Sequence, residues 1–203
     1  MNNKLKKAII LITIILIIDQ SVKIWIKTHM FLRQEFPVFG DWFLIHFTEN
    51  NGMAFGFEFG GDFGKIALSL FRIIAVGFIG YYIYKISKTN VKTGYVLSIA
   101  GVFAGALGNI IDSAFYGLIF SDNYYRVAEI FPKEGGYAPF LYAKVVDMFY
   151  FPLFSGTFPD WVPFVGGEDF LFFRPVFNIA DASITISVIV ILIFYRKYLK
   201  GNN

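Results

Sequence analysis

Four long apolar runs, at about 8–26, 66–86, 95–115 and 179–196, constrain the fold of this chain more than any other feature. Each run is close to the roughly 20 residues that a helix needs to cross the hydrocarbon core of a bilayer. The first run follows lysines, as the apolar region of a secretory signal does. It has no A-x-A cleavage site and continues into DQSVKIWIK, so we predict a retained helix.

Composition indicates the same class of protein. Hydrophobic residues make up 56% and aromatic residues 20% of the 203 residues, too much for an ordinary soluble domain. We therefore expect a membrane protein that is mainly α, a four-transmembrane-helix bundle with a small extracytoplasmic β-rich cap. Residues 1–203 should form a single integral membrane domain.

Basic residues predict the orientation of the helices. Three segments carry them: Lys4, Lys6 and Lys7; Lys85, Lys88 and Lys92; and Arg196, Lys197 and Lys200. These are nine of the 18 basic residues, and the same segments contain none of the 15 acidic residues. Because short cytoplasmic loops are enriched in Lys and Arg, we expect both termini in the cytoplasm. The segments at about 27–65 and 116–178 would then be extracytoplasmic, and EFPVFGDWFLIHFTEN predicts one or two strands in the first of them.

The residue types that are missing or scarce narrow the chemistry. Cysteine is absent, which excludes disulfides, thiolate metal sites and thiol nucleophiles. The two histidines, His29 and His46, lie apart from each other and from any metal-binding pattern, so we expect surface or interfacial histidines. Any reaction must therefore use oxygen or nitrogen side chains, and we expect no metal or organic cofactor.

Four polar side chains within the predicted helices lie at similar depth. With a rise of 1.5 Å per residue from the cytoplasmic ends, Asp19 lies about 17 Å along the first helix. Asn109 and Asp112 lie about 21 and 26 Å along the third, and Asp181 about 22 Å along the fourth. A carboxylate at the centre of a membrane helix costs at least about 2.5–3.5 kcal/mol. We therefore expect these side chains to converge on an interior pocket.

Local spacing supports this convergence. NIID (109–112) and NIAD (178–181) each place an asparagine three residues before an aspartate, which predicts that each pair shares one face of its helix. Gly101, Gly105 and Gly108 give the third helix a smooth surface for a close neighbour. Helix packing alone is the simpler explanation for the glycines and remains an alternative for the two pairs.

Asp147 stands out in the second extracytoplasmic segment, because AKVVDMFYFPLF surrounds it with apolar and aromatic residues and offers only Lys144 as a local partner. Burial and a second nearby carboxylate would both raise its pKa. Asp147 and Asp181 are thus a candidate pair of acids that share a proton and activate a water molecule. From spacing alone, a pair of Asp147 with Asp112 remains open.

Five sequence blocks resemble a known family, and they occur in the family's order. They are DQSVK (19–23), NNGMAFG (50–56), GALGNIID (105–112), VVD (145–147) and FNIAD (177–181). Together they are similar to the motifs of lipoprotein signal peptidase, or signal peptidase II, the bacterial inner-membrane aspartyl peptidase family. The resemblance implies that Asp147 and Asp181 are catalytic. It implies binding or supporting roles for Asp19, Lys23, Asn50, Gly52, Gly105, Asn109, Asp112 and Asn178.

The resemblance also implies the reaction. The expected function is intramembrane endoproteolysis that removes the signal peptide from a prolipoprotein, with cleavage before a cysteine that already carries diacylglycerol. The expected partners are this substrate and membrane lipid, without nucleic acid, and we expect a monomer. The expected location is the bacterial cytoplasmic (inner) membrane, with the active site near the extracytoplasmic face.

This chain departs from the family pattern in two places. Many members have arginine after the aspartate of the third helix, whereas this chain has Ser113, so the cation that would pair with Asp112 is missing or comes from elsewhere. The segments 113–144 and 148–176 are longer than in compact members, and a substrate lid or a partner surface are both open interpretations of them.

Two other classes of function compete with the peptidase. Intramembrane carboxylates also serve proton-coupled carriers, although the sequence shows no inverted repeat. A non-enzymatic scaffold would explain the glycines and aromatic residues, but it would leave the costly intramembrane acids without a purpose.

Overall fold

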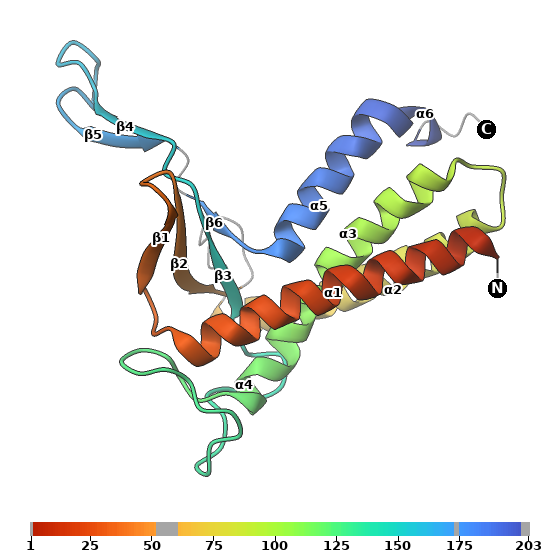
Figure 1. Ribbon diagram of the computed structural model, residues 1–203, viewed down its shortest axis with the longest axis horizontal. Helices are drawn as coiled ribbons and strands as arrows, with labels where there is room; N and C mark the ends of the chain where they lie inside the picture. Colours follow the sequence, from red (N-terminus) through yellow and green to blue (C-terminus); the bar gives the residue numbers. More distant parts are fainter. Residues whose placement is uncertain (1, 52–60, 173–174, 200–203) are drawn as a thin grey trace.

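Long helices form one part of the molecule (Figure 1), and the computed structural model describes residues 2–51, 61–172 and 175–199. The helices are α1 (Asn3–His29), α2 (Gly61–Ser87), α3 (Thr93–Ile111) and α5 (Ile179–Val190). A π-helical turn at Asp112–Tyr116 and the short α4 (Gly117–Ile119) extend α3, while a π-helical turn at Ile191–Tyr195 and α6 (Arg196–Leu199) extend α5. Within the described ranges, Asn3–His29, Gly64–Ser87, Thr93–Ile119 and Ile179–Leu199 are long and apolar enough to cross a membrane. The predicted four-helix architecture is confirmed.

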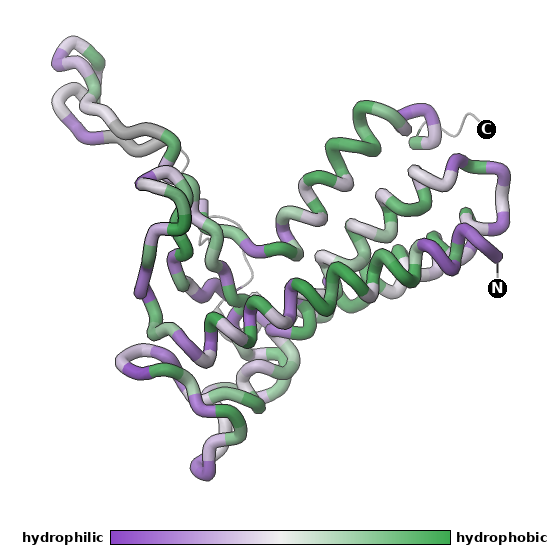
Figure 2. The backbone as a smooth tube through the Cα atoms, in the orientation of Figure 1, coloured by the Kyte–Doolittle hydropathy of each residue, from purple (hydrophilic) through white to green (hydrophobic). Residues whose placement is uncertain are grey.

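Helix α3 is the central helix of the bundle. It packs against α1, α2 and α5, and half of its span is buried, compared with 17% of each other span. Green apolar residues follow the helices over most of their length in Figure 2. Lipid is as apolar as these side chains, so close backbone packing rather than water exclusion must hold the helices together.

The glycines of α3 permit that close packing, as the sequence predicts. A Cβ at Gly105 would lie 2.2 Å from the carbonyl oxygen of Ala180 on α5, so no larger residue fits there. Gly101 faces the same helix, and its carbonyl oxygen accepts a hydrogen bond from the hydroxyl of Ser183 at 2.9 Å. Helix α5 is therefore held against α3 at backbone contact distance.

A four-stranded antiparallel sheet packs at one end of the helices. Its order is β1 (Glu35–Phe39), β2 (Phe43–Asn50), β3 (Val145–Tyr150) and β6 (Val176–Phe177). The strands predicted within residues 27–65 are present, and Pro37 lies on the edge strand β1, where its missing N–H is tolerated. A separate hairpin, β4 (Phe154–Thr157) and β5 (Asp169–Phe172), projects away from this sheet (Figure 1).

Apolar side chains join the sheet to the helix ends. Buried Ile26 of α1 and Met30, which directly follows α1, pack with Phe47 of β2, Met148 of β3 and Phe120, which follows α4. This cluster fixes β3 beside α1 and brings the start of α5, which follows β6 directly, to the same place. The sheet thus brings β3, an apolar strand with one aspartate at Asp147, to the level of the polar residues of the bundle.

The described residues of the three basic segments lie at the opposite end of the helices, where Figure 1 shows both termini and the turn between α2 and α3. The ammonium of Lys4 donates to the carbonyl oxygens of Thr89 and Val91 in that turn, at 2.7 Å each. The hydroxyl of Tyr198 accepts the backbone N–H of Lys92 at 3.2 Å. One end of the bundle is therefore basic and the other carries the sheet.

Candidate active site

Asp147 lies on β3 with only 3% of its surface exposed. Its carboxylate accepts hydrogen bonds from the side-chain amides of Asn178, at 2.7 Å, and Asn50. The β2–β3 register explains the second bond, because Thr48 pairs with Asp147 and Asn50 lies two residues further along the same face of β2. Lys144, the local partner considered from the sequence, instead donates to the hydroxyl of Tyr124 at 3.0 Å.

Asp181 lies in the first turn of α5, where Asn178 caps the helix. The Asn178 side-chain oxygen accepts the backbone N–H of Asp181 at 2.9 Å, and the Asp181 carboxylate accepts the backbone N–H of Asn178 at 3.4 Å. This reciprocal arrangement is a capping box. The sequence prediction that Asn178 and Asp181 share a helical face is therefore wrong for this pair, since Asn178 precedes the helix. The cap turns its amide toward Asp147 instead.

Two asparagines connect the acids. Asn109 of α3 donates to the carboxylate of Asp181 at 2.8 Å, while Asn178 donates to Asp147 and, at 3.1 Å, to the side-chain oxygen of Asn109. The two acids therefore share one hydrogen-bonded cluster, although they lie 34 residues apart in the sequence, one on a strand and one on a helix. Convergence of Asn109 and Asp181, predicted from their depth, is confirmed by this geometry.

Burial and charge act together on Asp147. Burial, and then the negative charge of Asp181, raise the pKa of Asp147 to about 8, against the opposing effects of Lys23, Asn50 and Asn178. A carboxylic acid of this kind holds its proton at neutral pH and can donate it.

Beside this cluster, Lys23 forms ion pairs with two further acids. Its ammonium lies 3.0 Å from Asp19 and 2.8 Å from Asp112, and it donates to the side-chain oxygen of Asn109 at 3.0 Å. All three charged side chains are at most 1% exposed. Asp112 therefore has a buried cation as its partner, namely Lys23, although the arginine of many members is absent. Ser113, at that position, donates its hydroxyl to the carbonyl oxygen of Asn109 at 3.1 Å.

The same acids hold the site's backbone in place. Asp19 accepts the backbone N–H of Ala180 at 2.9 Å, and Asp112 accepts the backbone N–H of Val146 at 3.2 Å. Each bond fixes the residue directly before a candidate catalytic acid. The carboxylate of Asp112 is thus already bound by Lys23 and by the backbone N–H of Val146. This favours Asp181 over Asp112 as the partner of Asp147.

Two of the predicted site residues are glycines. Gly105 lies on α3 against Ala180, where it sets the approach of α5 to α3. Gly52 lies outside the described residues. In the part of the chain that the structure describes, no group of three or more His, Asp or Glu side chains is arranged to hold a metal ion. His46 pairs with Glu35 at 2.7 Å, and His29 bonds to the carbonyl oxygen of Trp25 at 3.0 Å.

Three site residues were not predicted as such. Gln20 donates to Asp19 and Asp112, at 3.0 Å each, and accepts the hydroxyl of Tyr116 at 3.1 Å. Arg72 of α2 interacts favourably with the charge of Asp181. The signal for Arg72 was in the sequence, because a single arginine in the apolar run 66–86 indicates a polar partner inside the membrane. Gln20 lies within the DQSVK block, but nothing in its spacing pointed to Tyr116.

Comparison with known proteins identifies the family. The family model described as Signal peptidase (SPase) II matches residues 11–197. The chain belongs to the signal peptidase II family. A lipoprotein signal peptidase of Porphyromonas gingivalis is 50% identical over 188 residues, which cover 92% of this chain and 81% of that protein. One from Amoebophilus asiaticus is 37% identical over 183 residues, covering 89% and 73%.

Solved structures agree with this assignment to the signal peptidase II family. A structure described as a bacterial membrane enzyme superposes with a TM-score of 0.62 at 25% identity, covering 98% of this chain and 92% of that one. A second has a TM-score of 0.58 at 26% identity, covering 93% and 91%. The family predicted from the five sequence blocks is confirmed, and with it the aspartic peptidase class and a multi-pass bacterial membrane protein.

Proposed function

We propose that this signal peptidase II cleaves diacylglyceryl-modified prolipoproteins before the lipidated cysteine, with Asp147 and Asp181 as its catalytic pair. The single observation that carries the assignment of the pair is their joint cluster, in which Asn178 and Asn109 bond to one acid each and to one another. Such a cluster holds both acids at one place and prevents either from turning away. Family membership supports the prolipoprotein as substrate.

In the proposed mechanism, Asp147 is protonated and Asp181 is ionised at the start. The first turn of a helix favours a negative charge, which suits Asp181, and the raised pKa of Asp147 suits a proton donor. Asp181 takes a proton from water as the water oxygen attacks the scissile carbonyl carbon, and Asp147 donates its proton to the carbonyl oxygen. The C–N bond then breaks as Asp181 passes its proton to the leaving nitrogen, and the new hydroxyl returns a proton to Asp147.

The location of the pair fits a lipidated substrate. We propose that the basic end of the bundle faces the cytoplasm, as the distribution of Lys and Arg supports, so that the acids lie toward the extracytoplasmic face. A signal peptide crosses the bilayer as a helix, and its scissile bond reaches this level while the acyl chains stay in lipid. Asn50 is only partly buried, and we propose that it bonds to the polar groups of an extended strand there, while the buried Asn109 and Asn178 hold the two acids. We further propose a single, monomeric integral membrane domain.

The direct test uses two precursors that differ only in the diacylglyceryl group on the cysteine. The purified protein should cleave the modified precursor before the cysteine and leave the unmodified one uncut, as mass spectrometry of the products would show. Equal cleavage of both precursors would contradict the proposed substrate class. Gradient-driven uptake into proteoliposomes, without cleavage, would instead favour the rival carrier.

The rate should depend on pH through the protonation of Asp147. Its proton is bound below a pKa of about 8 and lost above it, so kcat/KM should be constant near neutrality and fall as pH rises through about 8. Removing the Asn50 amide, which favours the ionised form of Asp147, should raise that pKa and move the decline in Asn50→Ala to higher pH. Thermal melts at each pH control for unfolding. A decline at the same pH in both proteins, or a rate that increases above pH 8, would contradict the assignment of the proton to Asp147.

A further inference from the structure

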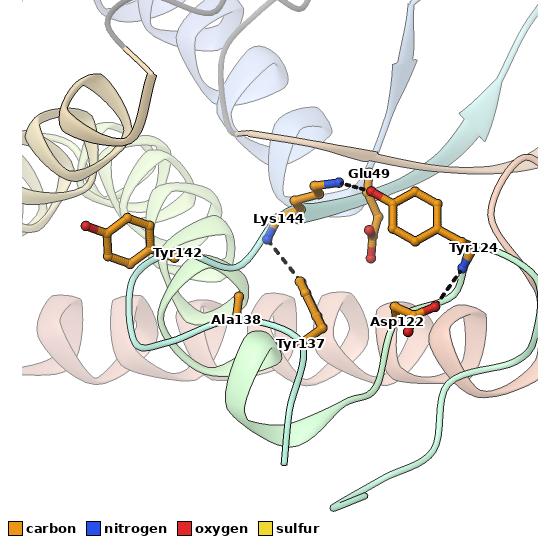
Figure 3. Close-up of a pocket in the computed structure, with 7 residues that line it drawn as sticks. All are labelled: Glu49, Asp122, Tyr124, Tyr137, Ala138, Tyr142 and Lys144. Carbon is orange, nitrogen blue, oxygen red and sulfur yellow. Dashed lines mark hydrogen bonds between the residues drawn. The ribbon is translucent and has the colours of Figure 1, made fainter. Parts of the chain in front are cut away.

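A recess lies on the other side of β2 and β3 from the catalytic pair and has no role in the mechanism above. It is an open pocket of about 460 Å³. We call it the tyrosine pocket, and Figure 3 shows its lining, which includes Glu49, Asp122, Tyr124, Tyr137, Tyr142 and Lys144. Most of these residues belong to the segment 113–144. From the sequence, a substrate lid and a partner surface were both open interpretations of this segment.

The strands β2 and β3 connect this pocket to the catalytic pair. Glu49 directly precedes Asn50 on β2 and pairs with Val146, which directly precedes Asp147 on β3. Successive side chains of a strand point to opposite faces, so Glu49 points away from the face that carries Asn50 and Asp147. Lys144 lies just before β3, and its side chain is on the Glu49 side (Figure 3). The pocket and the catalytic pair thus occupy two sides of one pair of strands.

Helix α1 gives the level of the pocket. Lys27 is fully buried and pairs with Glu49 at 2.8 Å, whereas Lys23, four residues earlier, pairs with Asp112 at the level of the catalytic cluster. Four residues of helix span about 6 Å, in the direction away from the basic end of the molecule. An extended polypeptide advances about 3.3 Å per residue, so chain that continues outward from the cut reaches this level within about two residues.

The lining suits a polypeptide. Lys144 donates to the hydroxyl of Tyr124 at 3.0 Å and has no ion pair among the described residues, while the charge of Glu49 is already balanced by Lys27. Burial and the charge of Glu49 raise the pKa of Tyr137, which keeps its hydroxyl protonated, and that oxygen accepts the backbone N–H of Lys144 at 3.1 Å. Rigid phenol rings with hydroxyl groups, beside one cation, provide both contact area and hydrogen bonds for a peptide.

The pocket wall is also fixed to the rest of the site. Lys65 of α2 donates to the carbonyl oxygen of Tyr142 at 2.5 Å and to the side chain of Asn51 at 3.0 Å, next to Asn50. Asn123 donates to the carbonyl oxygens of Lys27 and Met30 at 2.8 and 3.0 Å, which holds the Asp122–Tyr124 wall against the end of α1. A ligand in the tyrosine pocket would therefore contact a surface that hydrogen bonds hold in place. One of the residues that form these bonds, Lys65, also bonds to Asn51 beside the catalytic pair.

We propose that the tyrosine pocket binds the substrate polypeptide on the carboxyl side of the scissile bond, that is, the first residues of the mature lipoprotein. This inference rests on the proposed function and on the orientation proposed with it. It gives the long segment 113–144 a role in substrate binding, distinct from the lipid group and the signal peptide. Contacts here would act on substrate affinity and not on the chemical step.

The test compares two diacylglyceryl-modified precursors with the same signal peptide, a short one that ends at the cysteine and a long one that continues into the mature sequence. Wild-type protein should have a kcat/KM about tenfold higher for the long precursor than for the short one, because its KM is lower while kcat is unchanged. A tenfold change corresponds to the free energy of one or two hydrogen bonds. The double variant Tyr124→Ala, Lys144→Met should lose this preference and cleave the short precursor at the wild-type rate. Tyr125→Ala is the matched control, because Tyr125 is 97% exposed and does not line the pocket.

Each outcome decides the proposal. Loss of the length preference in the double variant alone supports the tyrosine pocket as the binding site. A wild-type protein without length preference, or a double variant that slows both precursors equally while melting as wild type does, would overturn it and leave the proposed function intact. Failure of the wild-type protein to cleave either lipidated precursor would overturn the proposed function and the pocket together.

Discussion

Asp147→Asn and Asp181→Asn should each lower turnover of a lipidated precursor by about 10⁴-fold, the upper range for loss of a general acid or base. Asparagine in place of Asp147 has no acidic proton to give to the scissile carbonyl. Asparagine in place of Asp181 cannot take a proton from water. Both replacements keep an oxygen that accepts the hydrogen bonds of Asn178 or Asn109, so the fold should persist. Single-turnover cleavage, with melting temperature recorded for each variant, measures the effect.

The control for this experiment is Asp41→Asn, since Asp41 is exposed in the turn between β1 and β2 and should tolerate the loss of its charge. The informative alternative is Asp112→Asn. If Asp112→Asn abolished turnover in a folded protein and Asp181→Asn retained it, the pair would be Asp147 with Asp112, as spacing alone allowed. Wild-type turnover by Asp147→Asn would rule out both pairs.

Much of the fold could be predicted because lipid imposes strict requirements on a sequence. A helix must be apolar over its whole span, so the apolar runs fixed the helices, and costly acids in them indicated a common interior site. The close approach of another helix at Gly105 could also be predicted, because a residue without a side chain on a helix face indicates a close neighbour. These inferences depend on local composition and on length, which a single sequence contains.

The rest depended on contacts between distant segments. Asn178 was expected on a helical face and proved to be the residue that caps α5, because the helix begins one residue later and frees the amide for Asp147. Lys23 pairs with Asp112 through an α1–α3 contact that no spacing reveals. The tyrosine pocket forms where Asn123 bonds to the end of α1, and the sequence of 113–144 has no periodicity that predicts it.

The second large effect should follow from removing Lys23. The protein buries two carboxylates, Asp19 and Asp112, around this one ammonium, all at most 1% exposed. Breaking a buried ion pair by removing one partner typically costs about 3–5 kcal/mol, because the remaining charge stays buried without compensation. For a chain of this size, about 1 kcal/mol corresponds to roughly 2–4 °C. Lys23→Met should therefore lower the melting temperature in detergent by about 6–20 °C.

A rescue distinguishes lost charge balance from lost packing in Lys23→Met. Adding Asp19→Asn and Asp112→Asn removes both uncompensated charges but keeps oxygens that accept the backbone N–H groups of Ala180 and Val146. The triple variant should therefore melt at a higher temperature than Lys23→Met alone. Lys133→Met, at an exposed loop position, is the control for loss of a lysine and should melt as wild type does. A triple variant less stable than Lys23→Met would mean that Lys23 acts through the packing of its alkyl chain, and that balance of the two buried acids is not what holds α1, α3 and α5 together.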